Sequence, residues 1–305
     1  MPFPDCIDNT IREAFVVCPV KARRAYFEDL APVAQSVHLH AGGAMAAGLE
    51  AVRRAYFERG QPHGYALEAG IKAMTAFWGD FNPPAASYKT LPNMIEALRY
   101  YFDVWQLGVD PLVPKDIEWS FKVPIPDLVH PDHGGPIYAT GRSDAPGELS
   151  GMYVIEDDKT ASSLGASWAA QWELDSQFTQ YVWAAQQLGK MPKDDPGGVL
   201  IRGVSILKPK VGKGGEYDRA ASFGHSQVLV YRPPWMVARW LEQFTRDVKR
   251  MIYAYLNNQW DYALHKNACA AYGGCAFKDL CLSAEPDRWI PVNFTKRKWN
   301  PLNPT

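Results

Sequence analysis

Two aspartates and a lysine near the middle of the chain are the residue types that metal-assisted hydrolysis needs. Asp144 ends one strand-like run, and Asp157 and Lys159 end the next. Alternate side chains of an extended strand point to the same face, so Asp157 and Lys159 share a face. If the two runs pair as a hairpin through a turn at Pro146 and Gly147, Asp144 lies beside Asp157. The sequence then brings all three side chains to one edge of a sheet.

Carboxylates that converge at a sheet edge form a hard-oxygen site suited to Mg²⁺ or Mn²⁺. A nearby lysine can hold a water and offset charge at a phosphate, so the set suits phosphodiester hydrolysis. An ordinary turn at Asp144 followed by a solvated hairpin would show the same letters, because short motifs also arise by chance.

The rest of the chain is predicted to alternate between helical and strand-like segments. Apolar residues recur at helical spacing in some segments, and short β-branched or aromatic runs lie between Pro, Gly and Asp turns in others. The predicted helices cover residues 11–26, 43–57, 65–77, 93–107, 167–188 and 235–256, and the predicted strands cover 119–125, 137–143, 151–159, 199–207 and 227–231. This order favours an α/β or α+β core between helical ends.

The composition excludes several classes of protein. The 305 residues are 47 % hydrophobic and 21 % charged, with a formal net charge of −1. These values are typical of globular proteins and exclude disordered and collagen-like chains. Near-zero charge argues against coating nucleic acid by bulk electrostatics but leaves room for a local basic groove. With no apolar run of membrane length and no signal-like start, we expect a cytoplasmic protein.

The strings at residues 141–144 (GRSD) and 154–160 (VIEDDKT) resemble the PD-(D/E)XK nuclease superfamily, in particular its RecB-like branch with the exonucleases of CRISPR adaptation. The resemblance implies a restriction-endonuclease-like α/β core, a mixed central sheet flanked by helices. It implies that Asp144, Asp157 and the main-chain carbonyl of Asp158 bind the metal. It also implies that Gln177 and Tyr181, one turn apart on the next helix, belong to the site.

The five cysteines fall at the two ends of the sequence, which in a reducing compartment favours metal ligation or catalysis over disulfides. The residues around Cys18 resemble the first-cysteine segment of the iron–sulfur members of this branch, where three more cysteines follow the core. Here those are Cys269, Cys275 and Cys281, with a wider first gap than is common. Four thiolates can hold either a [4Fe–4S] cluster or Zn²⁺, and the resemblance favours iron–sulfur. Cys6 is expected to be a bystander.

One feature departs from the family pattern. Members of this branch often carry a metal-ligating histidine on an early helix, and Ala46 stands at that position. Glu50, one turn further along, could supply a carboxylate instead, and His38 and His40 are alternatives before the helix. A solvated surface position for Glu50 is the competing interpretation. The sequence therefore leaves one or two catalytic metals open.

These features predict a single nuclease domain over 1–305, with a helical part at 1–110, a catalytic core at 111–232 and a C-terminal helix and cysteine segment at 233–305. Helical end segments joined by the cysteine cluster complete the expected fold. The predicted function is a metal-dependent DNA exonuclease with a structural [4Fe–4S] cluster, in a prokaryotic or phage-infected cytoplasm. DNA is the expected partner, with a helicase or recombination protein as a second.

Two other function classes stay open. A catalytically inactive DNA-binding or scaffold subunit of a recombination or repair complex would keep the fold and cluster, although retention of all three site residues argues against it. An iron–sulfur redox protein would be indifferent to divalent metal and is supported by the cysteines alone. Residues 212–215 (GKGG) lack the spacing and the Ser or Thr of a Walker A loop, so ATP-driven unwinding has to come from a partner.

Overall fold

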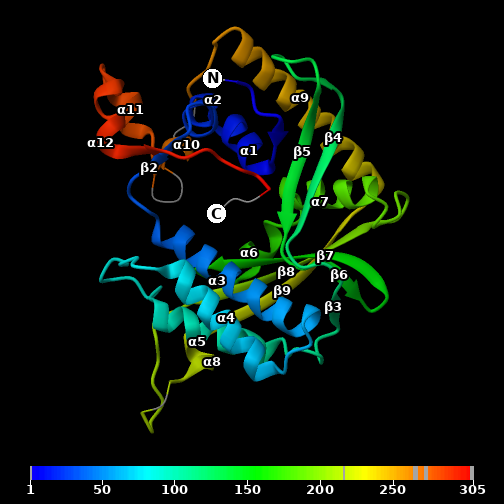
Figure 1. The fold of residues 1–305 in the computed structure, drawn as a ribbon, viewed down its shortest axis with the longest axis vertical. Helices are drawn as coiled ribbons and strands as arrows, with labels where there is room; N and C mark the ends of the chain where they lie inside the picture. The colour runs from blue at the N-terminus through cyan, green and yellow to red at the C-terminus, as the bar shows by residue number, and fades with distance from the viewer. Residues whose placement is uncertain (1, 216, 264–266, 271–273, 303–305) are drawn as a thin grey trace. The chain divides into compact units, whose positions relative to one another are not determined.

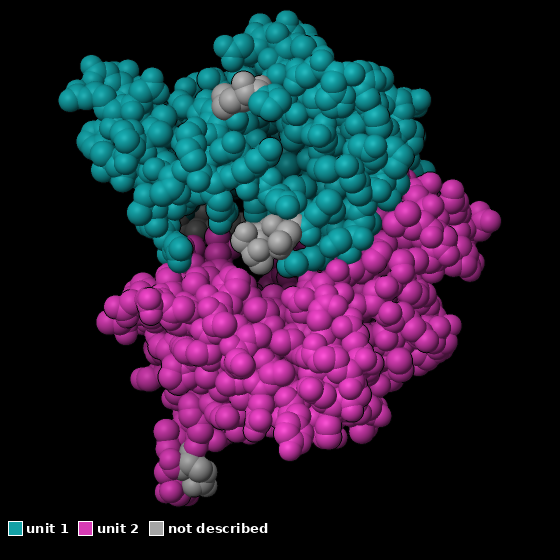
Figure 2. All heavy atoms as spheres, viewed as in Figure 1, with its two compact units in different colours: residues 1–35, 120–142, 235–305 teal, residues 36–119, 143–234 magenta. Residues whose placement is uncertain are grey.

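The computed structural model describes residues 2–215, 217–263, 267–270 and 274–302. The chain divides into two compact units, and each combines segments that are distant in sequence (Figure 2). Unit 1 comprises residues 1–35, 120–142 and 235–305, and unit 2 comprises 36–119 and 143–234.

Unit 2 is built on a mixed five-stranded sheet in the order β3-β6-β7-β8-β9. Its strands are β3 (Leu112–Pro114), β6 (Gly147–Leu149), β7 (Met152–Ala161), β8 (Gly197–Ile206) and β9 (Phe223–Arg232). β7 and β8 run parallel, with Asp157 opposite Ile201, and the other pairs are antiparallel. Every residue of β8 is buried, as expected for a central strand covered on both faces.

One face of this sheet is covered by three helices of unit 2 (Figure 1). These are α3 (Val37–Arg53), α4 (His63–Trp78) and α5 (Leu91–Val104), and Val204 and Ile206 of β8 belong to their shared apolar core. The helices α3 and α4 cross closely at glycines: a Cβ on Gly70 would come within 2.8 Å of the Gly48 carbonyl. The short α8 (Arg219–Ser222) precedes β9, and the π-helical turn η2 (Arg54–Glu58) continues α3.

The opposite face of the sheet is covered by α6 (Ala166–Ala170) and α7 (Ser176–Gln187). A Cβ on Gly197 would clash with Val182 of α7, and one on Gly203 with Trp168 of α6. Side chains alternate along a strand, so β8 offers odd-numbered residues to α6 and α7 and even-numbered residues to α3 and α5. The same division holds along its neighbour β7 and separates Asp157 from Asp158.

Unit 1 contains a second sheet, in the order β1-β5-β4. Its strands are β1 (Cys6–Ile7), β4 (Trp119–Val129) and β5 (Pro136–Ser143), whose outermost residues Trp119 and Ser143 fall in unit 2. The long helix α9 (Pro234–Leu256) is joined to α1 (Asn9–Val17) by a buried ion pair of 2.8 Å between Arg12 and Asp247. Across the described ranges, no helix is both long and apolar enough to cross a membrane.

The remaining elements of unit 1 are short. They are α1 (Asn9–Val17), α2 (Pro19–Ala22), the π-turn η1 (Arg23–Phe27), β2 (Leu30–Pro32), α10 (Asn267–Ala270), α11 (Lys278–Leu282), η4 (Pro286–Arg288), α12 (Ile290–Asn293) and β10 (Phe294–Lys296). β10 pairs antiparallel with β2. Leu30, Phe277, Leu280 and Phe294 form a small apolar core of their own.

Two predicted helices are interrupted in the structure. The helix expected over 11–26 ends at Val17, because Cys18 precedes a proline and is extended, with φ −162° and ψ 106°. The helix expected over 167–188 is split between α6 and α7, because the Asp175 carboxylate accepts the amides of Gln177 and Phe178 and starts a new helix there.

Candidate active site

The candidate site lies on β7 in unit 2, on the face covered by α7. Asp157 is 2 % exposed, and its carboxylate forms an ion pair with the Lys159 amine. The Lys159 side chain is 26 % exposed, and its nitrogen lies 5.4 Å from the centre of the Phe178 ring of α7. The predicted alternation is confirmed: the acid and the amine share a face, and the amine is the member that reaches solvent.

Asp144 lies at the fork where β5 and β6 separate. Its Oδ2 accepts the main-chain N–H of Asp158 at 2.6 Å, while the hydroxyl of Ser143 donates to the Glu156 carbonyl at 2.8 Å. The Asp144 carboxylate therefore binds the free edge of β7 beyond the end of β6, which pairs with β7 only as far as Val154.

The turn that brings Asp144 there differs from the predicted one. β6 and β7 are joined at Ser150 and Gly151, which have positive φ angles of 51° and 82°. Pro146 and Gly147 do not form a hairpin turn, because β6 begins at Gly147 and passes so close to β3 that a Cβ would come within 2.2 Å of the Val113 carbonyl. Asp144 is still close to Asp157, because it binds the N–H of the next residue, Asp158. The two aspartates do not form a direct cross-strand pair.

The opposite face of β7 carries a buried ionic network. Glu156 and Asp158 flank Asp157 in sequence, and Arg53 of α3 binds both, at 2.9 Å and 2.7 Å. The Tyr101 hydroxyl of α5 accepts from Arg53 at 2.9 Å and donates to Asp158 at 2.7 Å. Sequence patterns did not identify Arg53 or Glu156. The helical spacing of apolar residues around Arg53 does not show that this arginine faces a buried acid on a distant strand.

A second buried arginine extends this network along β8. Arg202 lies opposite Asp158 in the parallel ladder and pairs with Asp110 at 2.7 Å. Its guanidinium carbon is 4.9 Å from the centre of the Trp105 ring. The acids of β7 thus have two arginines beneath them and Lys159 above.

Crowding of acids away from water shifts their titration. Burial raises the pKa of Asp157 to about 8, with the Asp144 charge adding to the shift and Lys159 opposing it. Burial, together with the neighbouring Asp158 charge, also raises the pKa values of Asp144 and Glu156. Burial alone would lower the pKa of Lys159, but the Asp157 and Asp144 carboxylates outweigh it and the pKa is raised. Lys159 is therefore a cation in this site.

Gln177 and Tyr181 lie on α7, next in sequence to Phe178 and Val182, which contact Lys159 of β7 and Gly197 of β8. The Gln177 amide donates to the Tyr181 hydroxyl at 2.6 Å, and the Tyr181 side chain is buried. The cap of this helix, Asp175, is close enough to Lys159 for its charge to raise the lysine pKa. The structure thus brings the two residues together one turn apart, and their roles in the reaction stay predictions.

The early-helix candidates have other partners. Glu50 Oε1 accepts from Arg54 at 2.8 Å, so one of its oxygens is engaged by a cation of the same helix. His40 stacks on Phe81 at 4.0 Å between ring centres and contacts the Trp78 carbonyl at 3.2 Å. A metal-binding role for Glu50 stays a prediction, and Ala46 offers no ligand atom.

The four predicted cluster cysteines all belong to unit 1. Burial raises the pKa of Cys281, and the charges of Cys275, Cys18 and Cys269 raise it further. The Cys275 amide donates to the Cys269 carbonyl at 3.0 Å. The four thiols therefore act on one another electrostatically, and their ligation of a metal centre stays a prediction. Cys6 lies in β1, where burial raises its pKa.

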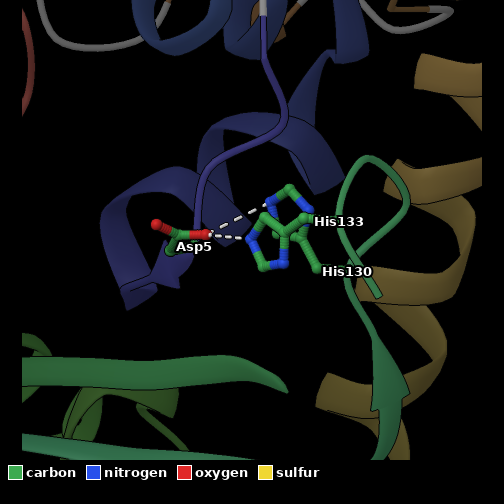
Figure 3. A group of neighbouring side chains, drawn as sticks. All are labelled: Asp5, His130 and His133. Carbon is green, nitrogen blue, oxygen red and sulfur yellow. Dashed lines mark hydrogen bonds and ion pairs between the residues drawn. The ribbon is translucent and has the colours of Figure 1, made fainter. Parts of the chain in front are cut away.

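A compact Asp–His–His group in unit 1 escaped the sequence analysis. Asp5, His130 and His133 place their ligand atoms within 4.8 Å of one another, and the spaced histidines at the β4–β5 turn were the available signal (Figure 3). Asp5 Oδ1 lies 2.8 Å from His133 Nε2 and 3.4 Å from His130 Nε2. Geometry alone makes this group a rival metal site.

Hydrogen bonds, however, use the lone pairs of both rings. The Nδ1 atoms of His130 and His133 accept backbone N–H groups from Asp132 and Gly135, at 3.2 Å and 3.0 Å. Coordination through Nε2 would put a proton on Nδ1, directly against those N–H groups. The rings are also stacked, 3.8 Å apart and 6° from parallel, so their in-plane lone pairs cannot meet at one ion. The group is a hydrogen-bonded staple that ties the N-terminal segment to the β4–β5 turn.

One of three comparisons with known proteins, that with solved structures, found a similar fold. No family model and no curated protein matches the sequence. Among solved structures, a predicted exonuclease from Eubacterium rectale is similar, with a TM-score of 0.51 and 11 % identity over 87 % of each chain. The structure of SSO0001 has a TM-score of 0.32 and 13 % identity over 77 % of this chain and 84 % of its own, too distant to support an argument. The chain therefore shares a mixed α/β fold with the Eubacterium rectale protein.

Proposed function

We propose that this protein is a metal-dependent DNA exonuclease of the RecB-like type, with its active site on β7. The observation that carries the proposal is the arrangement of Asp144, Asp157 and Lys159. Asp144 binds the main-chain N–H of Asp158, the residue after Asp157, and Asp157 pairs with the partly exposed Lys159, which supports the nuclease assignment. The nuclease-like fold shared with a predicted exonuclease supports the same class.

The charge balance of the site fits a divalent cation. Five carboxylates (Asp110, Asp144, Glu156, Asp157 and Asp158) face three cations (Arg53, Lys159 and Arg202), which leaves an excess of two negative charges. A buried side-chain oxygen of Glu156 has no hydrogen-bond partner, while Asp157 Oδ2 and Asp158 Oδ2 are engaged by the cations Lys159 and Arg53. The raised pKa values mean that protons offset the excess when no metal is present. One Mg²⁺ or Mn²⁺ would neutralise it instead.

Asp144, Asp157 and the carbonyl of Asp158 would hold the ion. A divalent ion there would supply Lewis-acid activation of water and of the phosphate. Lys159, as a cation, orients the attacking water, favours the loss of its proton to solvent by attracting the hydroxide that remains, and stabilises the negative charge that develops on the phosphate. Its ion pair with Asp157 keeps the amine beside the carboxylates and aimed at the open side of the site. Gln177 and Tyr181 would contact the DNA or the water from α7.

DNA as the substrate follows from the resemblance, and the digestion of ends follows from the resemblance and from the likeness to the predicted exonuclease of Eubacterium rectale. A helicase or recombination protein would supply the opened strands. The cysteines Cys18, Cys269, Cys275 and Cys281 would hold a structural [4Fe–4S] cluster, with Zn²⁺ as the alternative. Such a cluster would link the two ends of the chain and so close a long loop. A cross-link that closes a long loop restricts the unfolded state more than one that closes a short loop.

The direct test is degradation of linear DNA with Mn²⁺ or Mg²⁺ against EDTA, with circular DNA of the same sequence as the substrate without ends. We expect metal-dependent loss of the linear form alone and no loss with the Asp157→Ala variant. Equal degradation by the wild type and the variant would overturn the enzyme assignment. DNA binding without degradation by the wild type would instead support the inactive scaffold subunit.

A further inference from the structure

The last residue of α3, Arg53, connects the helical layer of unit 2 to the candidate metal site. Its side chain is 5 % exposed and lies beneath β7, on the face opposite Asp157 and Lys159. Nη1 is 2.7 Å from Asp158 Oδ2, and Nη2 is 2.9 Å from Glu156 Oε1. One planar guanidinium therefore holds the two acids that flank Asp157 in sequence.

Tyr101 completes the grip on Asp158. Its hydroxyl accepts from Arg53 Nη2 at 2.9 Å and donates to Asp158 Oδ1 at 2.7 Å. Both carboxylate oxygens of Asp158 are therefore contacted, one by the arginine and one by the phenol. The Tyr101 side chain is 1 % exposed, so water does not compete for these bonds.

The backbone of Asp158 is fixed as well. Its N–H donates to Asp144 Oδ2 at 2.6 Å, and the residue lies opposite Arg202 in the β7–β8 ladder. Asp158 is thus held at its N–H by Asp144 and at its side chain by Arg53 and Tyr101. A displacement of the whole residue, which would carry its carbonyl with it, would break at least one of these contacts.

We infer that Arg53 is a positioning residue of the metal site: by binding Asp158 and Glu156 it fixes the strand segment that presents Asp157 and the Asp158 carbonyl. This inference rests on the proposed function. Groups that orient metal ligands typically contribute 10- to 100-fold to metal affinity. The planar fork of arginine can bind two acids at once, whereas a lysine amine is a single point charge.

The alternative is that Arg53 only neutralises buried acids and stabilises the fold. Arg202 provides a matched control, because it is also a buried arginine on this face and pairs with Asp110 at 2.7 Å instead of gripping Asp158. The variants Arg53→Lys and Arg202→Lys keep the charge and lose the fork. Mn²⁺ affinity by titration calorimetry and the thermal midpoint of unfolding are measured for each variant and the wild type.

We expect Arg53→Lys to weaken Mn²⁺ binding by about 10- to 100-fold, whereas Arg202→Lys stays close to the wild type at a comparable loss of thermal midpoint. Raising the Mn²⁺ concentration should restore cleavage by Arg53→Lys. Equal weakening in both variants, or wild-type affinity in a folded Arg53→Lys, would overturn the inference.

Tyr101→Phe keeps the ring and removes the bridging hydroxyl, so it tests the same grip if Arg53→Lys does not fold. We expect weaker Mn²⁺ binding with a smaller change than for Arg53→Lys, and unchanged affinity would overturn the inference. The wild type separates the two claims. Mn²⁺ binding without DNA cleavage contradicts the proposed function and leaves the affinity comparison valid, whereas no Mn²⁺ binding contradicts both.

Discussion

The acids around β7 and the Asp5–His130–His133 staple are both compact sets of metal-ligating side chains, yet their lone pairs are used differently. In the staple, both ring nitrogens of each histidine are taken by the backbone or by Asp5. Around β7, a buried oxygen of Glu156 lacks a partner, Asp157 and Asp158 are bound to the cations Lys159 and Arg53, and acids outnumber bases. Short distances between ligand atoms therefore do not by themselves define a metal site. A buried oxygen without a hydrogen-bond partner and an excess of negative charge are the better indicators.

Replacing one acid in each group tests this difference with the largest expected effect. Asp157→Asn should reduce Mn²⁺-dependent DNA cleavage by about 10³-fold or more, because losing the ion removes several kcal/mol of transition-state stabilisation. Asp5→Asn, the matched change in the staple, should leave the rate close to that of the wild type. The measurement is the initial rate on end-labelled linear DNA, and a similar loss in both variants would contradict the comparison.

Lys159→Met separates chemistry from binding within the β7 group. The methionine keeps the length and removes the charge, so kcat should fall about 10²- to 10³-fold. KM for DNA and the Mn²⁺ dependence should change little, because the amine acts mainly on charge that develops in the transition state. A rise in KM with unchanged kcat would assign Lys159 to DNA binding instead.

The raised pKa of Asp157 predicts an unusual pH dependence of stability. In the folded, metal-free protein this acid holds its proton up to a pKa of about 8, while its ordinary value is 3.8. Between these values the folded state binds more protons than the unfolded state, so stability falls as pH rises. The slope from this group reaches about 1.4 kcal/mol per pH unit.

Thermal unfolding between pH 5 and pH 8 in EDTA measures this slope, and the Asp157→Asn variant should flatten it. Mn²⁺ should stabilise the protein more at pH 8 than at pH 6, because binding at low pH has to displace the proton. A stabilisation by Mn²⁺ that is independent of pH would contradict the assignment of Asp157 as a ligand.

The smallest effect is expected in the staple. His133→Ala removes its hydrogen bonds to Asp5 and Gly135 and the stacking on His130, and the side chain is half exposed. We expect a loss of about 1 kcal/mol in the free energy of unfolding, measured by urea denaturation, with no change in Mn²⁺ or Zn²⁺ content. Loss of a stoichiometric metal from this variant would show that the staple binds one.

The sequence predicted the parts of the fold that depend on local pattern. Alternation along β7 placed Asp157 and Lys159 on one face, and the apolar runs located β8 and α9. The prediction of helix boundaries failed where a single residue determines them. Pro19 ends α1 early, and the Asp175 cap splits the helix predicted over 167–188. The turn at Ser150 and Gly151 was missed because Pro146 and Gly147 have stronger turn propensity.

The sequence motifs predicted only the part of the candidate site that lies within them. Asp144, Asp157 and Lys159 came from short strings, but the Arg53 and Tyr101 contacts join residues far apart in sequence and have no local signal. The sequence also did not predict the division into two units, because each unit is assembled from segments that are far apart in sequence. Pairing between distant segments is set by packing of the whole chain rather than by local propensity.

Calorimetric titration of Mn²⁺ into EDTA-treated protein decides which of the two groups binds metal, with the wild type, Asp157→Asn and His133→Ala compared at one pH. We expect that wild type and His133→Ala bind Mn²⁺ alike and that Asp157→Asn loses that binding. Binding that survives in Asp157→Asn and disappears in His133→Ala would contradict this expectation.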